Sequence, residues 1–588
     1  MSSKIDLVTA EVIRSAMETI CFEMATYVSR HATTPILNQS NERNATILDS
    51  KGRLAGLSVG IPQFMLSSTL PVRLAIDFFG EDLKPGDVIL ANDPYYGGGH
   101  LPDFNVFSPV FADGKLLMFA SIQCHHGDTG GAVAGGYNTM AKDIWSEGTR
   151  YPLLKIVDGG KERRDVILLL RANNRLAGFI GDMQSQVGAA QLGASRLNDL
   201  IERYGAETVQ TAIDHTIDEA RRRFSEEIAR WPDGTYEADA YVDSDPQGNK
   251  DIHVHVAVTV KGDRLVLDFN GSDTRQHIAA WSTLGNTRGN ALGQLMSVVD
   301  PTIPKNEGFF DCVELIAPEG SCVNPTPNKP VSSGTHHPGT EVSDAVALAI
   351  AQFLPERVSP QTYKYGSPRQ MWGDKDPRTG KAFFDHGGEV NAGWCNGIKG
   401  ADGWGALPAA FGNLLKAPAE LNEVNFPHII RDRNYRMDSG GAGQWRGGLG
   451  SHFVKEVRTP TYISQYIVNQ RHVHPGIAGG RHGAPDEAIV SAGTDREVNI
   501  SPVVNAHLLE RGEALIYNFG GGGGWGDAYA RAPEAVLEDV WDEYVSIEGA
   551  ARDYGVVITG SVEAMDLALD HGATARLRAD LKGEKAAA

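Results

Sequence analysis

Hydrophobic residues recur at steps of three and four near the start of the chain, at Ile13, Met17, Ile20, Met24 and Val28. This spacing predicts a helix over residues 9–31 with one buried stripe. The same period returns over residues 185–230, where Gly205 divides two predicted helices and the turn "PDG" ends the second.

Two predicted hairpins follow from other patterns. In "FNVFSPVFADGKLLMFASIQC", residues 104–124, two apolar runs flank the turn signal "ADG". Over residues 235–275 apolar and polar residues alternate, as in a sheet with one solvated face. His253 and His255 share one face of this second hairpin. They could ligate a metal there, although an exposed strand face is the commoner place for such a pair.

Glycine and aromatic residues are dense from residue 356 to 527, as in "DSGGAGQWRGGLG" and "FGGGGGWGD". Strand-like runs lie between these stretches, so we expect the glycines to serve tight turns and close backbone approach rather than disorder. From residue 533 the pattern becomes helical again.

These patterns predict an α+β multidomain protein, with a mixed, β-rich core, N-terminal and mid-chain helices and a glycine-rich β region in the C-terminal half. The predicted parts are an N-terminal α/β domain with the candidate metal ligands over residues 1–232, a β-rich central and C-terminal region over 233–530, and a helical tail over 531–588.

Charge and composition narrow the function. The 588 residues carry 54 basic and 74 acidic side chains, a net charge of −20, without a basic run that could follow a phosphate backbone. No stretch reaches the roughly 18 apolar residues of a membrane span, and "MSSKIDLVTAEVIRS" lacks signal-peptide features. The five cysteines are scattered without a C-x-x-C pair. We expect a soluble, cytoplasmic protein with reduced thiols that contacts neither nucleic acid nor membrane.

One familiar motif is absent, and two others are present in an unsuitable context. No G-x-x-x-x-G-K-[ST] phosphate loop is present, so ATP has no familiar site in this chain. "GLSVG", residues 56–60, matches a nucleophile elbow, but a turn precedes it and Pro62 is poorly placed for a supporting helix. "GGGGWG", residues 521–526, matches G-x-G-x-x-G but lacks a second strand of a βαβ unit, which favours a glycine-rich turn.

Histidines and aspartates gather at the ends of the first hairpin, in the stretch from residue 97 to 131. His100 and Asp103 come before its first strand, while His125 and His126 end its second strand, and an antiparallel hairpin brings these points together at its open end. Imidazole and carboxylate together ligate Zn²⁺, Fe²⁺ or Mn²⁺, and such a site with an open position activates water. On spacing alone, a hydrogen-bonded polar cluster that caps the sheet explains the same residues equally well.

Five segments together resemble the hydantoinase B family, from about residue 7 to about residue 558 and in a consistent order. They are "NDPYYGGGHLPDFNVFSPVF", "CHHGDTGG", "DSGGAGQWRGGLG", "FGGGGGWGD" and "SIEGAARDYGVVI". The family comprises B subunits of ATP-dependent hydantoinases, 5-oxoprolinases and caprolactamases, and a related subunit of acetone and acetophenone carboxylases. The resemblance implies an A-type partner subunit with an actin-like ATPase fold, which uses ATP and Mg²⁺ to phosphorylate the substrate oxygen, while this subunit carries a metal and completes the reaction.

The resemblance also implies four metal ligands. The family's H-L-P-D falls on His100 and Asp103, and the first histidine of its H-H-x-D falls on His125. Its fourth ligand is an aspartate upstream of a D-x-x-G turn, and counting back without a gap from Asp49 places Glu42 there. Zn²⁺ is the expected ion, with Mn²⁺ and Fe²⁺ as alternatives that accept the same ligands.

The fourth ligand departs from the family pattern, because glutamate replaces aspartate in "ERNAT". A shifted register would place Asn44 at the position of Glu42 and remove the acidic ligand. Asp49 is a weaker candidate, because it opens the turn "DSKG", where aspartate commonly makes local hydrogen bonds.

Four further residues receive expected roles. Adjacent residues of an extended chain point to opposite faces, so His126 is expected to support the ligand His125 or to carry a proton rather than to ligate. The resemblance adds Asp128 as a second catalytic residue. His336 and His337, in "SSGTHHPGTEVSD", fall in a substrate-facing or interface loop of the family, although Ser-Asp before "AVALAIAQFL" also reads as a helix start.

The expected function is the opening of a lactam, hydantoin or oxoproline-type ring after phosphorylation by the partner. Carboxylation of a ketone through a phosphorylated enol is an alternative with the same ligands, and a non-catalytic scaffold is the third. A heterotetramer of two A-type and two B-type subunits is expected, with the glycine and aromatic patches around residues 398–450 as the contact surface.

Overall fold

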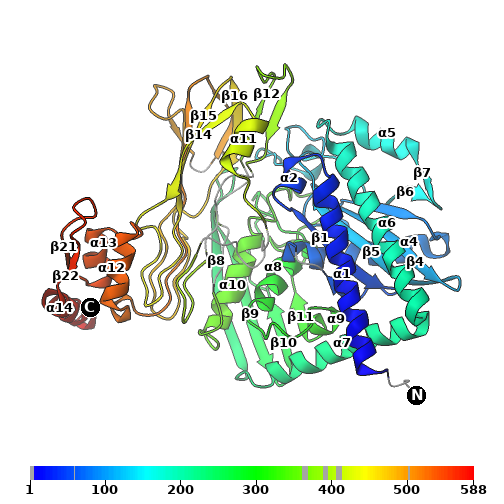
Figure 1. Cartoon of the computed structure of the whole chain (residues 1–588), viewed down its shortest axis with the longest axis horizontal. Coiled ribbons are helices and arrows are strands. Elements are labelled where there is room, and N and C mark those ends of the chain that lie inside the picture. Colours follow the sequence, from blue (N-terminus) through cyan, green and yellow to red (C-terminus); the bar gives the residue numbers. More distant parts are fainter. Residues whose placement is uncertain are drawn as a thin grey trace.

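The computed structural model describes residues 5–57, 60–359, 364, 369–387, 395–404, 414–500 and 503–587. These residues form an α+β multidomain fold, which confirms the predicted class. Figure 1 shows the N-terminal helices and the first sheet at one end of the molecule and the C-terminal helices at the other. Among the described residues, none of the helices combines the length and the hydropathy that crossing a bilayer requires.

A seven-stranded antiparallel sheet organises the N-terminal part, in the order β2-β1-β5-β4-β3-β6-β7. The strands are β1 (Arg43–Asp49), β2 (Leu54–Leu57), β3 (Val88–Ala91), β4 (Asp103–Ala112), β5 (Lys115–His125), β6 (Leu154–Asp158) and β7 (Lys161–Glu162). Strands β4 and β5 are the predicted hairpin, and they occupy the centre of this sheet.

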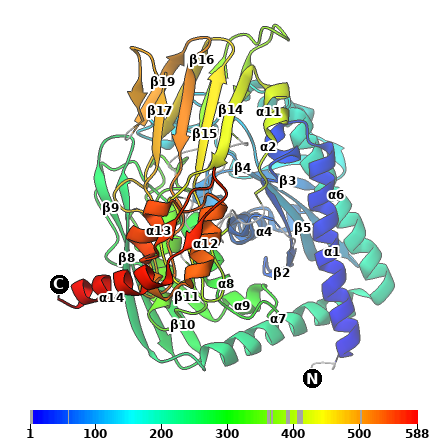
Figure 2. The ribbon, with the colours of Figure 1, turned by 60° about the vertical axis from the view of Figure 1, so that its left-hand side comes forward.

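Helices cover both faces of this sheet. On one face lie α1 (Leu7–His31), α6 (Phe179–Tyr204) and α7 (Ala206–Ile228), with α1 beside α6 in Figure 2. The predicted stripe of α1 is buried in the core that these helices share with the sheet. The other face packs against α4 (Thr69–Phe79). Gly205 separates α6 from α7 at a φ of 82°, a conformation that glycine adopts without a steric penalty.

Three short helices complete the N-terminal part: α2 (Pro35–Asn38), α3 (Pro62–Ser67) and α5 (Arg164–Ala172). The expectation that Pro62 disfavours a helix was wrong, because Pro62 occupies the first turn of α3, where the missing N–H costs nothing. Ser58 of the "GLSVG" motif lies outside the described residues.

A four-stranded sheet in the order β11-β10-β9-β8 forms the middle of the chain. Its strands are β8 (Gly234–Ser244), β9 (Lys250–Lys261), β10 (Arg264–Asp268) and β11 (Val313–Ile316), and the associated helices are α8 (Leu284–Met296), α9 (Glu307–Phe310) and α10 (Gly339–Ala351). One hydrophobic core joins this layer to Leu54, Leu66 and Leu101 of the N-terminal part. The two layers therefore pack as one body across residue 232.

The C-terminal half contains a β-sandwich whose sheets run β13-β12-β16-β19 and β14-β15-β20-β17-β18, with a hydrophobic core between them. The elements are β12 (Gln370–Gly373), β13 (Phe383–Asp385), α11 (Ala419–Asn425), β14 (His428–Tyr435), β15 (Ser451–Val457), β16 (Thr461–Tyr466), β17 (Glu487–Val490), β18 (Val498–Asn499), β19 (Val503–Leu509) and β20 (Ala514–Asn518).

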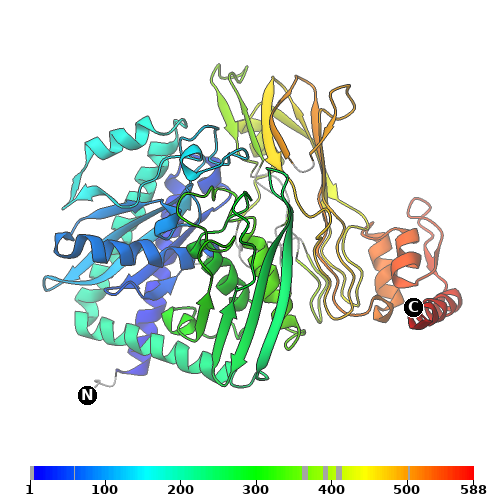
Figure 3. The same cartoon turned by 180° about the vertical axis from the view of Figure 1, so that it is seen from behind.

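Glycine-rich chains run side by side between this sandwich and the C-terminal helices (Figure 3). Gly441 donates a hydrogen bond to the carbonyl of Gly522 at 2.8 Å, and Gly522 donates to Gly448 at 2.9 Å. A Cβ at Gly522 would lie 2.4 Å from the carbonyl oxygen of Cys395, so only glycine permits this spacing. The expectation of close backbone approach holds for residues 520–524. The expectation of a turn there was wrong, because the segment runs straight between its neighbours.

The tail forms a small helical unit with its own core. Its elements are α12 (Pro533–Trp541), α13 (Ile547–Tyr554), the strand pair β21 (Ile558–Thr559) and β22 (Ala568–Leu569), and α14 (His571–Ala587). The helical pattern predicted from residue 533 is interrupted by β21 and β22, so α14 begins only at His571.

Candidate metal centre

The open end of the β4–β5 hairpin brings the candidate ligands together. Asp103, the first residue of β4, pairs directly with His125, the last residue of β5. Cross-strand partners share a face, so both side chains point to the same side of the sheet. The backbone N–H of His125 donates to the carbonyl of Glu42 at 2.9 Å, which places the residue before β1 beside them.

Four side chains form a compact cluster. Nδ1 of His100 lies 2.8 Å from Oδ2 of Asp103, and Nδ1 of His125 lies 3.3 Å from Oδ1 of the same carboxylate. Oε2 of Glu42 lies 3.8 Å from Nδ1 of His125. One ligand atom from each of His100, Asp103 and His125 lies within 4.8 Å of the other two. Asp103 is therefore the centre of the cluster.

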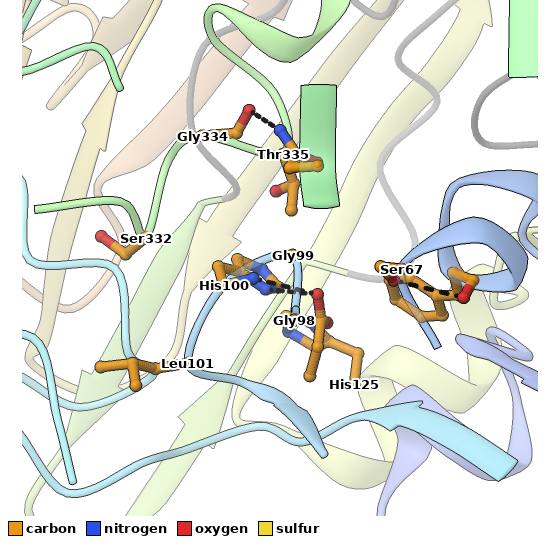
Figure 4. Close-up of polar contacts among 12 residues, drawn as sticks. Ser67, Gly98, Gly99, His100, Leu101, His125, Ser332, Gly334 and Thr335 are labelled. Atoms are coloured by element: carbon orange, nitrogen blue, oxygen red, sulfur yellow. Dashed lines mark hydrogen bonds and ion pairs between the residues drawn. The ribbon is translucent and has the colours of Figure 1, made fainter. Parts of the chain in front are cut away.

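The chain before β4 is shaped to this carboxylate. The backbone N–H of His100 donates to Oδ2 of Asp103 at 3.3 Å. A Cβ at Gly99 would lie 2.5 Å from that oxygen, so glycine is needed for the close approach. Figure 4 shows His100 and His125 together below the loop that carries Thr335.

Burial and mutual charge set the protonation of the cluster. Burial lowers the pKa of His125 to about 4, although the hydrogen bond to Asp103 opposes this, so its imidazole is neutral. Burial favours a neutral Asp103, but His100 and His125 hold its pKa below the ordinary value. Burial and then the charge of Asp103 raise the pKa of Glu42 to about 8, against the opposing charge of Lys416.

Two residues that sequence reasoning missed border the cluster. The hydroxyl of Tyr137 lies 2.8 Å from Nε2 of His100 and orients that ring. The ring of His386, just after β13, lies 5.2 Å from the ring of His125 and 5.5 Å from that of Tyr137. Tyr137 follows the H-H-x-D stretch, but the residues around it form no motif that would indicate a role. His386 comes from the sandwich, and no local spacing could have connected it to the hairpin.

A cavity of about 350 Å³ lies next to the cluster. His386 belongs to its wall and also contacts His125, so it lies between the cavity and the candidate ligands. Both the N-terminal part and the sandwich line the cavity, through Thr33, Thr34, Asn38, Ser40, Gly127, Leu176, Phe384, Asn422 and Phe426. Amide and hydroxyl groups line the cavity beside apolar surface, which suits an uncharged polar ring, and Asp385 adds one carboxylate whose Oδ2 accepts a hydrogen bond from Nζ of Lys455 at 2.5 Å.

Comparison with known proteins identifies the family of this chain. The model of the family described as Hydantoinase B/oxoprolinase matches residues 6–528. The chain belongs to this family. It is 31% identical over 600 aligned positions to the caprolactamase subunit beta of Pseudomonas jessenii, and the alignment covers 98% of this chain and 99% of that one.

Two solved structures resemble this member of the hydantoinase B family. The ATP-dependent caprolactamase of Pseudomonas jessenii matches with a TM-score of 0.89 and 30% identity, covering 98% of this chain and 100% of the other. A nucleotide-free acetone carboxylase matches with a TM-score of 0.85 and 18% identity, covering 99% and 83%. The second likeness shows a shared fold alone.

The side chains of the cluster fit a divalent cation. Two imidazoles and two carboxylates converge in a buried space, and such groups are the usual ligands of Zn²⁺, Mn²⁺ and Fe²⁺. Nε2 of His125 is buried and has no hydrogen-bond partner among the described residues. Burial, and then the charge of Asp103, raises the pKa of Glu42 to about 8, and a bound cation would favour its ionised form.

The structure also separates the alternatives for the fourth position. Glu42 reaches the cluster in the gapless register. Asn44 lies beyond it on β1, opposite Gln123, and packs closely against Gly60. Asp49 is at the far end of the strand, where its side chain accepts the backbone N–H groups of Lys51 and Arg53.

His126 and Asp128 lie away from the cluster, contrary to the expected catalytic roles. The His126 ring points to the helical face, where Nε2 lies 2.6 Å from Oε1 of Gln186 and the ring packs on Phe104 and Phe179. Side chains alternate along the strand, so His126 points away from the face that carries His125. This agrees with the prediction that His126 is not a ligand. Oδ1 of Asp128 accepts from Nη1 of Arg175 at 2.8 Å and Oδ2 accepts the backbone N–H of Arg175 at 2.9 Å, which fixes two loops together.

The two histidines of the 332–344 loop take different positions. His336 faces the cluster, with its ring 6.0 Å from Tyr137, and burial followed by the surrounding histidines lowers its pKa well below the ordinary value. His337 is fully buried, and its Nδ1 lies 3.0 Å from Oε2 of Glu341. The predicted helix start at Ser343 was wrong, because α10 already begins at Gly339 and includes Ser343 and Asp344.

We expect His126→Ala to leave the metal content unchanged while lowering the free energy of unfolding. The substitution leaves the buried amide oxygen of Gln186 unpaired and opens a cavity beside Phe104, a loss of about 2 to 4 kcal/mol together. Denaturant unfolding and elemental analysis of the same preparation measure both quantities. Loss of the metal at unchanged stability would return His126 to the ligand set.

Proposed function

We propose that this chain is the metal-carrying B subunit of an ATP-dependent complex that opens a cyclic amide ring of the lactam, hydantoin or oxoproline type. The observation that carries the proposal is the cluster of the buried His100, Asp103 and His125 with the partly exposed Glu42, beside a cavity lined mainly by amide, hydroxyl and apolar groups. Support comes from the near-complete alignment with a caprolactamase beta subunit.

The partner in this proposal is an A-type subunit that binds ATP and Mg²⁺ and phosphorylates the amide oxygen. This chain lacks a phosphate loop in its sequence, and its relative is named as one subunit of an enzyme. Two A-type and two B-type subunits would form a heterotetramer. Within the surface expected around residues 398–450, the glycines of residues 440–450 pack against other backbone segments of the same chain and offer no side chain for a contact. Trp404 and Val424, exposed by 76% and 71%, are the better candidates for an interface.

Glu42, His100, Asp103 and His125 would hold one divalent ion, Zn²⁺ first and Mn²⁺ or Fe²⁺ as alternatives. Such an ion supplies Lewis acidity and lowers the pKa of water. The chain itself orients the ligands: Tyr137 fixes the His100 ring through Nε2, and Asp103 faces the Nδ1 atoms of both imidazoles. His386 and His336 enclose the same space as neutral imidazoles, because burial lowers the pKa of each well below its ordinary value.

Turnover by the reconstituted complex tests the function. With ATP, the co-purified A-type and B-type subunits are expected to consume a cyclic amide and release phosphate without bicarbonate. If the complex consumes a ketone, and only when bicarbonate is present, the carboxylase alternative is favoured. The shared fold with an acetone carboxylase is the reason for this second assay. ATP-dependent turnover that persists after the B subunit is omitted would make this chain a scaffold.

The affinity of the cluster for Zn²⁺ is expected to rise about tenfold per pH unit up to about pH 8 and then to level off, because binding displaces the proton held by Glu42. The raised pKa of Glu42, about 8, sets the end of this window. His125 adds no slope there, since its pKa of about 4 leaves it neutral throughout.

Competition titrations with a zinc chelator between about pH 6 and about pH 9 measure this slope. Glu42→Gln should bind more weakly with a flat profile, since the amide carries no proton to displace. An unchanged slope in this variant would contradict the role of Glu42.

A further inference from the structure

A second group of metal-ligating side chains lies on the β8–β9 sheet, apart from the hairpin cluster. The register of the two strands places Asp239 opposite His255 and Tyr241 opposite His253. Because side chains alternate along a strand, Asp239, His253 and His255 all project from the same face. The sequence predicted the shared face of the two histidines, but the aspartate is supplied by the neighbouring strand.

The three side chains converge on one point. Oδ1 of Asp239 lies 2.6 Å from Nε2 of His253 and 2.9 Å from Nδ1 of His255. One ligand atom from each lies within 4.8 Å of the other two, a spread that a single ion with bonds of about 2.0 to 2.2 Å can span after a small opening. Two imidazoles and one carboxylate leave further coordination positions for water.

Neighbouring residues hold both imidazoles in place. Tyr241 is stacked between His253, at 4.9 Å, and His472, at 4.8 Å. The backbone N–H of His255 donates to the hydroxyl of Ser272 at 3.1 Å, and Gly271 leaves the ring of His255 the space that a Cβ would fill. Ligands that are already oriented lose little freedom when an ion binds.

The site is open to solvent and keeps its charge. The side chains of Asp239, His253 and His255 are 48%, 31% and 20% exposed, so an ion can enter from water. Burial favours the neutral acid, but hydrogen bonds from His255 and His253 together hold the pKa of Asp239 below its ordinary value. The group therefore offers one carboxylate beside two imidazole rings.

We propose that Asp239, His253 and His255 form a second metal site, which takes Zn²⁺ or a neighbouring transition-metal ion from solution. A bound ion crosslinks β8 to β9. Through the stack of His253, Tyr241 and His472, it also braces the segment after β16 whose backbone N–H groups donate to Asp243 of β8. The site is independent of the proposed enzymatic function, because it shares no residue with the hairpin cluster.

Zinc stoichiometry of the full-length chain tests the proposal. After removal of metals with a chelator, equilibrium dialysis against Zn²⁺ with elemental analysis should give one more ion per wild-type chain than per Asp239→Asn or His255→Gln chain. The affinity for that ion should fall by more than about 100-fold in each variant, since loss of an outer partner of a ligand already costs about 10 to 100-fold. His571→Ala removes an exposed histidine elsewhere and should bind as the wild type does.

Equal stoichiometry and affinity in the wild type and both variants would overturn the proposal. Circular dichroism checks that each variant is folded, and His253→Gln replaces either one that is not. Asp103→Asn should lose the ion of the hairpin cluster and keep the ion on β8–β9. Loss of both ions in Asp239→Asn would count against two independent sites.

Discussion

Asp103→Ala is expected to abolish metal binding by the hairpin cluster and to lower turnover by the complex more than about 100-fold, beyond what loss of an outer partner costs. Asp103 contacts the Nδ1 atoms of both His100 and His125, at 2.8 and 3.3 Å. Without it, the two buried imidazoles lose the anion that lies between them, and Glu42 alone is left to supply an acidic ligand. Elemental analysis and steady-state turnover on the same preparation measure both effects.

A matched control separates this loss from general destabilisation. Asp182 is a buried carboxylate of the same N-terminal part, and its oxygens accept hydrogen bonds from Thr33 and Thr34 rather than from the cluster. Asp182→Asn should lower stability but keep the metal. Retention of a full complement of metal in both His100→Ala and Asp103→Ala would reduce the cluster to a polar cap on the open end of a hairpin.

The isolated chain is expected to neither hydrolyse ATP nor turn over a cyclic amide, whereas addition of the A-type subunit should restore both activities. The reason is that the proposed division of labour assigns ATP to the A-type subunit, and no phosphate loop occurs in the sequence of this chain. Phosphate release and substrate consumption, measured for each subunit alone and for the mixture with Zn²⁺ or Mn²⁺ added, give the comparison.

Native mass spectrometry of the co-expressed pair supplies the matching structural result. A complex of two copies of each subunit is expected. Trp404→Ala should weaken this complex if the exposed indole is an anchor, since aromatic anchors carry much of the energy of interfaces. Robust turnover by this chain alone, or a monomer in the co-expressed sample, would contradict the division of labour.

The hairpin site could be predicted from the sequence because it depends on local geometry alone. The turn pairs Ala112 with Lys115, an irregularity between Val110 and Phe111 then shifts the register by one residue, and the shifted register brings Asp103 opposite His125. The period of two then decides that His126 faces the helices instead of the cluster. The helices α1, α6 and α7 were predictable for a similar reason, since each buries one periodic stripe.

The rest depends on contacts between distant parts of the chain. His386 reaches His125 only because the sandwich packs against the end of the hairpin, and the cavity exists only between those two parts. The run from Gly520 to Gly524 looks like a turn in isolation, and its extended form follows from hydrogen bonds to three other segments. Helix α10 begins four residues before the Ser-Asp signal, at Gly339, which packs closely against Gly334 and Asn290.

Anomalous X-ray scattering from crystals of the full-length chain, grown without added metal, tests the metal assignment most directly. Data collected above and below the absorption edges of zinc, iron and manganese should show one strong peak between His100, Asp103, His125 and Glu42, at about 2.0 to 2.2 Å from its ligand atoms if the ion is Zn²⁺. The edge at which the peak appears identifies the ion. Complete data with no anomalous peak at this cluster, and with the four side chains bonded only to one another, would contradict the metal centre.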